Sequence, residues 1–187
     1  MIIVFMIMSK LKSVRKLYNG LYRTGYPHGG LGFPITWSGI NTGELTCLDI
    51  GCGHGILGRR FKKYVGIDIS DYVIDENKKR YPELEFYALD AKNISSKLGE
   101  FDIVIAIDTF EHFPQSEIEE HLKAISGIKA GFFLFSICCR ESGFAKGLHT
   151  CLMSREKWLL MIGDYFKIVD SSELNRQSTF CVKAENL

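Results

Sequence analysis

The sequence predicts one α/β domain in which helices cover a parallel β-sheet. Short apolar runs alternate with segments of helical periodicity over most of the 187 residues. The runs at 45–50 and 101–107 are apolar almost throughout, which is typical of strands buried on both faces of a sheet. Glycines stand at every second position just after the first of these runs. A hydrophobic content of 46% is sufficient for a packed core.

The periodicity divides the chain into elements. Residues 10–22 place apolar side chains on one helical face, and residues 24–34 are rich in glycine and proline and indicate a loop. Further helices are expected over 56–63, 71–80 and 116–126, and after Ser154 as an N-cap. Strands are expected over 45–50, 64–69, 84–89, 101–107 and 131–137, with a closing antiparallel pair over 165–171 and 178–184. Residues 1–43 thus precede a main unit over 44–187.

Charge and hydropathy exclude several kinds of partner. The formal net charge of +1 gives no overall field that would attract nucleic acid or a membrane surface. The charges before Glu44 are all basic, so an acidic substrate and an ordinary solvated helix face both remain open there. The apolar start at residues 1–8 is too short to span a bilayer, and an alternative start at Met8 would leave it out.

The six cysteines indicate free thiols. They form no Cys-x-x-Cys pair and no zinc-ligand spacing with histidine. Cys138 and Cys139 are adjacent, but no third thiol lies near them in the sequence to complete a site for a soft metal. We therefore expect no metal site and a reducing, cytoplasmic environment.

The most specific pattern is the spaced glycine turn after the first strand. Asp49 stands two residues before Gly51, and Gly53 and Gly55 follow. A dinucleotide fingerprint requires glycine or alanine where this chain has Ile56. The chain also lacks a Tyr-x-x-x-Lys pair, so a nicotinamide-dependent oxidoreductase is disfavoured. The pattern instead resembles motif I of the class I S-adenosylmethionine-dependent methyltransferases.

This resemblance covers about residues 44–184 and implies a fold, a cofactor and a reaction. The family has a Rossmann-like sandwich whose seven-stranded, mostly parallel sheet has the order 3-2-1-4-5-7-6, with the last strand antiparallel. Its cofactor is S-adenosylmethionine, which leaves as S-adenosylhomocysteine. Residues before motif I cap the cofactor in many members, so residues 1–43 are expected to form a cap. Candidates for its wall are Tyr18, Tyr22, Tyr26, His28 and Trp37, although these aromatics could instead simply pack a helix onto the sheet.

Two acidic residues at later strand ends extend the expected cofactor site. Asp68 ends the second strand, where a carboxylate can accept hydrogen bonds from both ribose hydroxyls; an N-cap for the helix at 71–80 is the alternative. The resemblance places Asp90 near the adenine amino group and the Ala91 N–H near the ring, with a turn-capping Asp90 as the alternative. The predicted cofactor-binding residues are Asp49, Gly51, Cys52, Gly53, Gly55, Asp68, Ile69, Asp90, Ala91 and Asp108.

The segment after the fourth strand carries the expected acceptor chemistry. Residues 108–112, Asp-Thr-Phe-Glu-His, resemble the Leu-Glu-His segment of many small-molecule methyltransferases. The predicted catalytic residues are therefore Asp108, Glu111 and His112. His112 could take a proton from an attacking hydroxyl or amine, because an unperturbed imidazole has a pKa of about 6.5. Holding the loop by hydrogen bonds is the alternative for His112, and His149 is expected to border the acceptor pocket.

These features predict methyl transfer to an oxygen or nitrogen atom, most readily of a small molecule. No Asp/Asn-Pro-Pro-Tyr/Phe segment of the kind used to grip a flipped DNA base follows the fourth strand, while RNA and protein acceptors remain open. A non-catalytic, cofactor-binding subunit that acts through a protein partner is the main alternative. We expect no membrane partner, and the sequence leaves the acceptor and the oligomeric state open.

Overall fold

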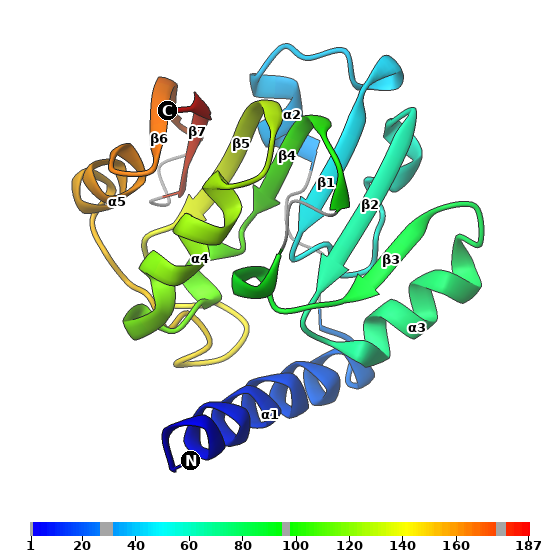
Figure 1. The fold of residues 1–187 in the computed structure, drawn as a ribbon, viewed down its shortest axis with the longest axis vertical. Coiled ribbons are helices and arrows are strands. Elements are labelled where there is room, and N and C mark those ends of the chain that lie inside the picture. The colour runs from blue at the N-terminus through cyan, green and yellow to red at the C-terminus, as the bar shows by residue number, and fades with distance from the viewer. Residues whose placement is uncertain (1, 27–31, 95–97, 175–178) are drawn as a thin grey trace.

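The structure is a computed structural model, and it describes residues 2–26, 32–94, 98–174 and 179–187. A seven-stranded sheet with the strand order β3-β2-β1-β4-β5-β7-β6 forms its centre (Figure 1). The parallel strands are β1 (Thr46–Ile50), β2 (Lys63–Asp68), β3 (Glu85–Ala88), β4 (Phe101–Ile107) and β5 (Ala130–Cys138). β7 (Thr179–Asn186) runs antiparallel to both β5 and β6 (Phe166–Glu173). The predicted fold class, strand order and antiparallel last strand are confirmed.

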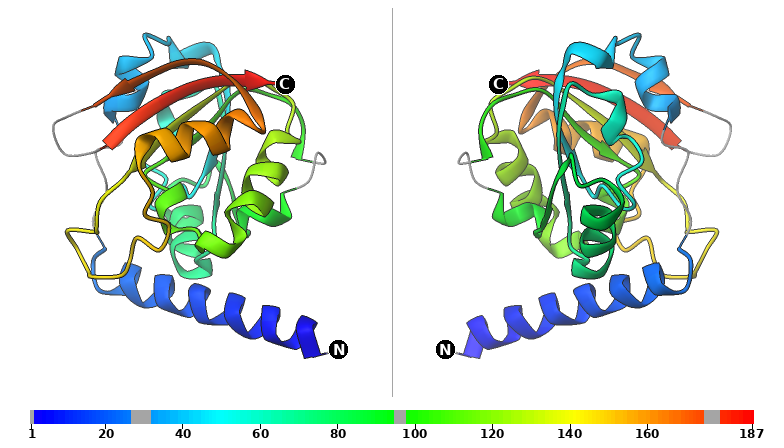
Figure 2. Two further views of the ribbon diagram at one scale, coloured as in Figure 1. Left: turned by 90° about the vertical axis from the view of Figure 1, so that its left-hand side faces the viewer. Right: turned by 90° about the vertical axis from the view of Figure 1, so that its right-hand side faces the viewer.

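Helices lie on both faces of this sheet and across one end of it. The helices are α1 (Ile2–Arg23), α2 (Gly32–Trp37), α3 (Asp71–Arg80), α4 (Ile118–Ser126) and α5 (Arg155–Gly163). Figure 2 shows α4 and α5 together on one side of the sheet. α1 runs across the end of the sheet at which the parallel strands finish (Figure 1). The N-terminal end of α1 extends past the rest of the fold in both views of Figure 2. No helix among the described residues is both long and apolar enough to cross a membrane.

Alternate side chains of the central strands fill two separate cores. In β4, Val104 and Ala106 belong to the core that contains Trp158 of α5. Ile103 and Ile105 of the same strand belong to the core on the α1 and α3 side. This alternation follows from the two-residue period of a strand, and both faces are apolar because helices cover both. The continuous apolar run that predicted β4 is explained by this double burial.

One predicted helix and one predicted loop boundary were wrong. The helix expected over 56–63 is absent, and only a single 3-10 turn, Gly58–Arg60, stands between β1 and β2. The connection contains four glycines within residues 51–58, and each costs a helix roughly 1 kcal/mol relative to alanine. The loop expected over 24–34 is also too long, because α2 already begins at Gly32. Pro34 lies in the first turn of α2, where a missing backbone N–H costs no helical hydrogen bond.

Trp158 provides a direct test of the α5 core. The predicted N-cap is confirmed, since the Ser154 hydroxyl accepts a hydrogen bond from the Lys157 N–H, and Trp158 is fully buried. We expect Trp158→Ala to lower the free energy of unfolding by about 3–5 kcal/mol because it leaves a large cavity. Urea denaturation measures this loss. Leu160→Ala on the same helix is the control, because Leu160 is 74% exposed and its truncation should change stability by less than about 0.5 kcal/mol.

Candidate cofactor and acceptor site

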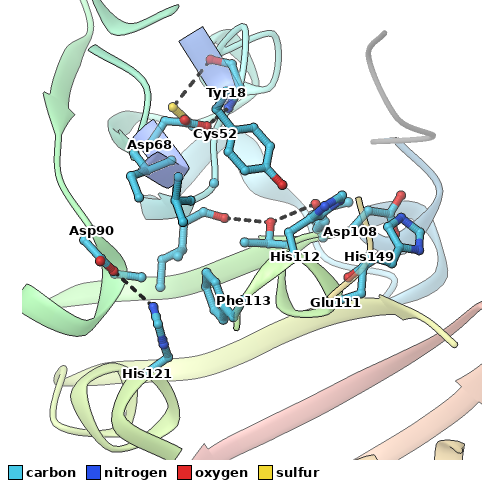
Figure 3. A pocket seen from close by; sticks show the side chains of 18 of the residues that line it. Tyr18, Cys52, Asp68, Asp90, Asp108, Glu111, His112, Phe113, His121 and His149 are labelled. Carbon is cyan, nitrogen blue, oxygen red and sulfur yellow. Dashed lines mark hydrogen bonds and ion pairs between the residues drawn. The ribbon is translucent and has the colours of Figure 1, made fainter. Parts of the chain in front are cut away.

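A cavity of about 340 Å³ lies at the carboxyl ends of the parallel strands (Figure 3). Ligands bind at this edge in open α/β sheets, because the loops that follow the strands converge there. α1, the turn after β1 and the ends of β2, β4 and β5 all contribute to the walls. The predicted site residues that line the cavity are Gly51, Cys52, Gly53, Asp68, Ile69, Asp90, Ala91, Asp108, Glu111 and His112. Asp49 and Gly55, also predicted, do not line it.

The turn after β1 is built from left-handed glycines. Gly51, Gly53 and Gly55 have φ angles of +71°, +49° and +65°. The N–H groups of Gly51 and Cys52 both donate to the carbonyl of Ile67, at 2.8 and 2.9 Å, and thereby fasten the turn to β2. A Cβ on Gly55 would lie 2.7 Å from the Phe86 ring, so this glycine permits close packing behind the turn. Gly55 therefore shapes the site from outside the cavity.

Asp49 is a buried carboxyl behind the same turn. Its Oδ2 accepts a 2.6 Å hydrogen bond from the Tyr64 hydroxyl. Burial raises the pKa of Asp49 to about 7, although the Tyr64 hydrogen bond opposes this shift. The Asp49 carboxyl therefore contributes to the local structure through its hydrogen bond with Tyr64. The cofactor contact expected of Asp49 stays a prediction.

The raised pKa of Asp49 makes stability depend on pH. A carboxyl whose folded pKa lies above its unfolded value of about 3.9 favours folding fully below that value, and the advantage is lost as pH rises toward 7. We expect Asp49→Asn to match the wild type near pH 4 and to exceed its free energy of unfolding near pH 8, by on the order of 2–4 kcal/mol. Urea denaturation at both pH values measures this. Equal stability of the two proteins at pH 8 would contradict the raised pKa.

Asp68 lies at the end of β2 and accepts hydrogen bonds from three directions. Its Oδ2 accepts from the Gly53 N–H at 3.1 Å and from the Tyr22 hydroxyl at 3.2 Å, and its Oδ1 accepts from the Ser70 N–H at 2.9 Å. Burial raises the pKa of Asp68, while these donors lower it. The alternative role of Asp68 as the N-cap of α3 is wrong, because the Ser70 hydroxyl accepts from the Val73 N–H and caps that helix.

Asp90, which follows β3, has the turn-capping role that the sequence offered, while its contact with adenine stays a prediction. It lines the cavity and also caps a 3-10 turn, Ala91–Asn93, by accepting a hydrogen bond from the Lys92 N–H. Its Oδ1 also lies 3.0 Å from Nε2 of His121 (Figure 3). Burial raises the pKa of Asp90, but the His121 hydrogen bond and charge and the Lys92 N–H and charge outweigh burial and lower it overall. Asp90 is therefore a charged hydrogen-bond acceptor that is held in place in the wall of the cavity.

Aromatic side chains of α1 and of the residues just after it form the wall of the cavity opposite the strand ends. Tyr18, Tyr22 and Tyr26 line it and also pack in the core on that side. The Tyr22 and Tyr26 rings meet edge to face with centroids 5.5 Å apart, and Phe144 packs on Tyr26 at 5.2 Å. The two expectations for these aromatics, cavity wall and helix packing, are thus met together. His28 lies outside the described residues, as does the side chain of Trp37.

Asp108 adopts a strained backbone conformation at the end of β4. Its φ of +48° is the only positive value among the described residues that are not glycine, and aspartate tolerates this region better than most residues. The Ser136 hydroxyl donates to Asp108 Oδ1 at 2.6 Å, and the Asp108 N–H donates back to Ser136. β5 thus fixes this carboxylate in the cavity wall.

Glu111 is fully buried beside Asp108. Its Oε1 accepts a hydrogen bond from the Cys138 N–H at 3.1 Å, while no described residue hydrogen bonds to its Oε2. Burial, followed by the charge of Asp108, raises the pKa of Glu111 well above its usual range. The site therefore favours the protonated form of Glu111 more than water does, and in that form the carboxyl can donate a hydrogen bond.

His112 presents a neutral imidazole to the cavity. Its Nδ1 lies 3.2 Å from the Leu148 carbonyl, which identifies Nδ1 as the donor and leaves Nε2 as an acceptor. Burial and then the neighbouring His149 lower the pKa of His112 to about 4. The ring packs edge to face against His149, with centroids 4.7 Å apart. His112 thus holds the loop, and it also lines the cavity.

Sequence patterns did not identify several residues of the wall. Phe113 stacks on His121 with centroids 4.0 Å apart, and both line the cavity beside Asp90. The sequence does not identify His121 as a wall residue, because a helical period reports burial but not the partner of a ring nitrogen. Residues from the segment 140–149 also enter the wall, and His149, predicted to border the pocket, is among them.

Comparisons with known proteins agree with this geometry. The family described as "Methyltransferase domain" matches residues 47–128, which include every predicted cofactor-binding and catalytic residue. The mitochondrial ubiquinone biosynthesis O-methyltransferase of Candida albicans is 32% identical over 110 residues, which cover 51% of this chain and 33% of that protein. The matched part of the chain therefore spans about a third of the length of this curated relative.

Solved structures share the fold. Magnesium protoporphyrin IX methyltransferase from Synechocystis PCC 6803, solved with bound S-adenosylhomocysteine, has a TM-score of 0.69 at 18% identity and covers 95% of this chain and 99% of that one. The N-methyltransferase NodS from Bradyrhizobium japonicum WM9 has a TM-score of 0.62 at 17% identity and covers 77% and 79% of the two chains. These structures share the seven-stranded fold with this chain, and the family match makes residues 47–128 similar to a methyltransferase domain.

Proposed function

We propose that the protein transfers the methyl group of S-adenosylmethionine to an oxygen or nitrogen atom of a small molecule. One observation carries this proposal: a single cavity collects the glycine turn, Asp68 and Asp90 on one side and Asp108, Glu111 and His112 on the other. Figure 3 shows these two groups of side chains on opposite parts of the cavity wall. Methyl transfer needs this arrangement, because donor and acceptor must meet in one water-poor space.

The cofactor side would hold the donor by hydrogen bonds. Asp68 would accept from the ribose hydroxyls, which requires the Tyr22 hydroxyl to yield its place on Oδ2. Asp90, held in its charged form by His121, would accept from the adenine amino group, and the Ala91 N–H would donate to the ring. The bound sulfonium supplies an already activated methyl group, so the protein mainly has to position the acceptor.

The acceptor side favours positioning over strong base catalysis. A pKa of about 4 makes His112 a weak base, so it accepts a proton readily only from an acidic hydroxyl or during a late proton transfer. Glu111, when it is protonated, would donate a hydrogen bond to an acceptor oxygen or nitrogen. Asp108, fixed by Ser136, would orient a hydroxyl or amine of the acceptor toward the methyl group.

A small acceptor fits the shape of the site better than a macromolecule. The tyrosines of α1 and the segment 140–149 close over the strand ends and leave about 340 Å³, the scale of a small-molecule pocket. The names of the relatives, a ubiquinone biosynthesis O-methyltransferase and a magnesium protoporphyrin IX methyltransferase, support a small molecule as well. We also propose a cytoplasmic location, because the cysteine pattern fits a reducing compartment.

Methyl transfer from labelled S-adenosylmethionine to pooled phenols, amines and carboxylates tests this function, with RNA and protein pools alongside. We expect a labelled small molecule, with kcat reduced at least about tenfold in His112→Ala and unchanged KM for the donor. Label in RNA or protein alone would overturn the small-molecule acceptor. Tight donor binding without any labelled product in these pools would favour the non-catalytic alternative.

A further inference from the structure

Three potential metal ligands converge in the acceptor side of the cavity. Glu111, Cys138 and His149 each offer one ligand atom, and these atoms all lie within 4.8 Å of one another. They come from three different parts of the chain: the turn after β4, the end of β5 and the segment that follows β5. We propose that this group, named here the Glu-Cys-His cluster, binds a divalent transition-metal ion of the zinc type.

The unpaired oxygen of Glu111 points to a missing ligand. Glu111 is completely buried, and no described residue donates to its Oε2 or pairs with its charge. Burying a carboxylate oxygen without a partner is costly, and a bound cation removes that cost by pairing with the ionised group. Cys138 is tied to the same carboxylate, because its N–H donates to Oε1. The polypeptide thus places a thiol and an unpaired carboxylate oxygen side by side.

The position of His149 is fixed by hydrogen bonds to the Glu111 segment. The N–H groups of Thr150 and Cys151 both donate to the Glu111 carbonyl, at 2.8 and 3.0 Å. The Thr150 hydroxyl donates to the carbonyls of residues 112 and 113, and the His112 ring hydrogen bonds to the carbonyl of residue 148. These bonds bring the His149 imidazole to the cluster as a consequence of the fold. Figure 3 shows His149 next to Glu111 and His112.

The donor set selects the kind of metal. One thiol, one imidazole and one carboxylate suit zinc and similar borderline-soft ions, whereas magnesium and calcium prefer oxygen ligands alone. Three protein ligands leave a fourth position open, as in zinc sites that bind a substrate or water. Zinc bonds of about 2.0–2.3 Å require ligand atoms roughly 3.5 Å apart, so the cluster must contract by about 1 Å on binding. The His149 ring is half-buried, and its Nδ1 hydrogen bonds to the Arg140 carbonyl at 2.5 Å, which leaves Nε2 as the nitrogen that can bind the ion.

The sequence predicted no metal site because these ligands are far apart along the chain and lack zinc-finger spacing. The proposal replaces that expectation. Binding of the ion does not depend on the methyl-transfer proposal, since neither donor nor acceptor takes part. One consequence does rest on it: an acceptor hydroxyl that entered the open position would lose its proton more easily. The ion would then supply the basicity that His112 lacks.

Metal titration without donor or acceptor tests the cluster. Chelator-treated protein is titrated with Zn²⁺ by calorimetry, with Mg²⁺ as a comparison, and with Co²⁺ by absorption spectroscopy. We expect one Zn²⁺ per chain with micromolar or tighter affinity, weaker binding of Mg²⁺, and a sulfur-to-cobalt charge-transfer band. Cys138→Ser should abolish the band and weaken Zn²⁺ binding by at least about 100-fold. His149→Asn should weaken Zn²⁺ binding similarly, and it provides a second test if Cys138→Ser does not fold.

Cys139→Ser is the matched control, because the neighbouring thiol lies outside the Glu-Cys-His cluster. This variant should retain the wild-type Zn²⁺ affinity and the cobalt band. Absence of Zn²⁺ binding by the wild type would overturn the proposal. So would a cobalt band that survives in Cys138→Ser or disappears only in Cys139→Ser.

Discussion

Asp68→Ala is expected to weaken S-adenosylmethionine binding by roughly 100-fold. The carboxylate would lose two charge-assisted hydrogen bonds to the ribose, together worth about 2–3 kcal/mol. The substitution also removes the acceptor that holds the Gly53 N–H in the glycine turn, so the turn itself becomes less ordered. Isothermal titration calorimetry measures the affinity, and S-adenosylhomocysteine should show the same loss because it carries the same ribose.

Asp75→Ala is the matched control for this prediction. Asp75 lies exposed on α3, so removing its carboxyl should leave the affinity for S-adenosylmethionine within about twofold of the wild type. Circular dichroism and thermal unfolding verify that Asp68→Ala is folded. A folded Asp68→Ala protein that binds the donor as tightly as the wild type would refute the assignment of Asp68 to the ribose.

Gly51→Val is expected to abolish donor binding and to destabilise the fold. Gly51 has a φ of +71°, and a Cβ there would lie 2.6 Å from both Oγ1 and Cγ2 of Thr109. Thr109 cannot easily yield, because its hydroxyl donates to the carbonyls of Ile50 and Ile107. The clash and the left-handed strain together should lower the free energy of unfolding by about 3 kcal/mol or more. Urea denaturation measures this loss, and calorimetry measures donor binding.

Gly99→Val separates backbone strain from the clash. Gly99 has a φ of +103°, but no atom of the described residues lies within 4 Å of a Cβ built there, and Gly99 does not line the cavity. We expect a loss of roughly 1–2 kcal/mol from strain alone, with donor affinity unchanged. If Gly51→Val and Gly99→Val lost the same stability and both bound the donor, the tight contact between the turn and Thr109 would have no role in the site.

Much of the fold was predictable because each central strand is buried on both faces. The apolar run of β4 was located to the residue, and α3 was placed over the observed range, since Ser70 and Pro82 limit its two ends. The strand order itself came from the resemblance of the glycine turn to motif I. This short pattern is specific, because a turn with left-handed backbone at these fixed positions requires glycine at each of them.

Other features depend on contacts that the sequence does not display. The amphipathic pattern of residues 56–63 predicts a helix, but a connection with four glycines forms a tight turn instead. The pairing of Asp90 with His121 joins residues that are 31 positions apart, and the Glu-Cys-His cluster joins three separate segments. Periodicity reports which face of an element is buried and cannot report which polar atoms meet across elements.

Calorimetric titration with S-adenosylmethionine is the most direct test of the central claim, that this cavity is a methyl-donor site. The titration is run on the wild type and on Asp68→Ala, with NAD as the competing nucleotide ligand. We predict micromolar binding of S-adenosylmethionine and S-adenosylhomocysteine by the wild type, a loss of roughly 100-fold in the variant, and no binding of NAD. Failure of the folded wild type to bind S-adenosylmethionine, or binding of NAD in its place, would contradict the claim.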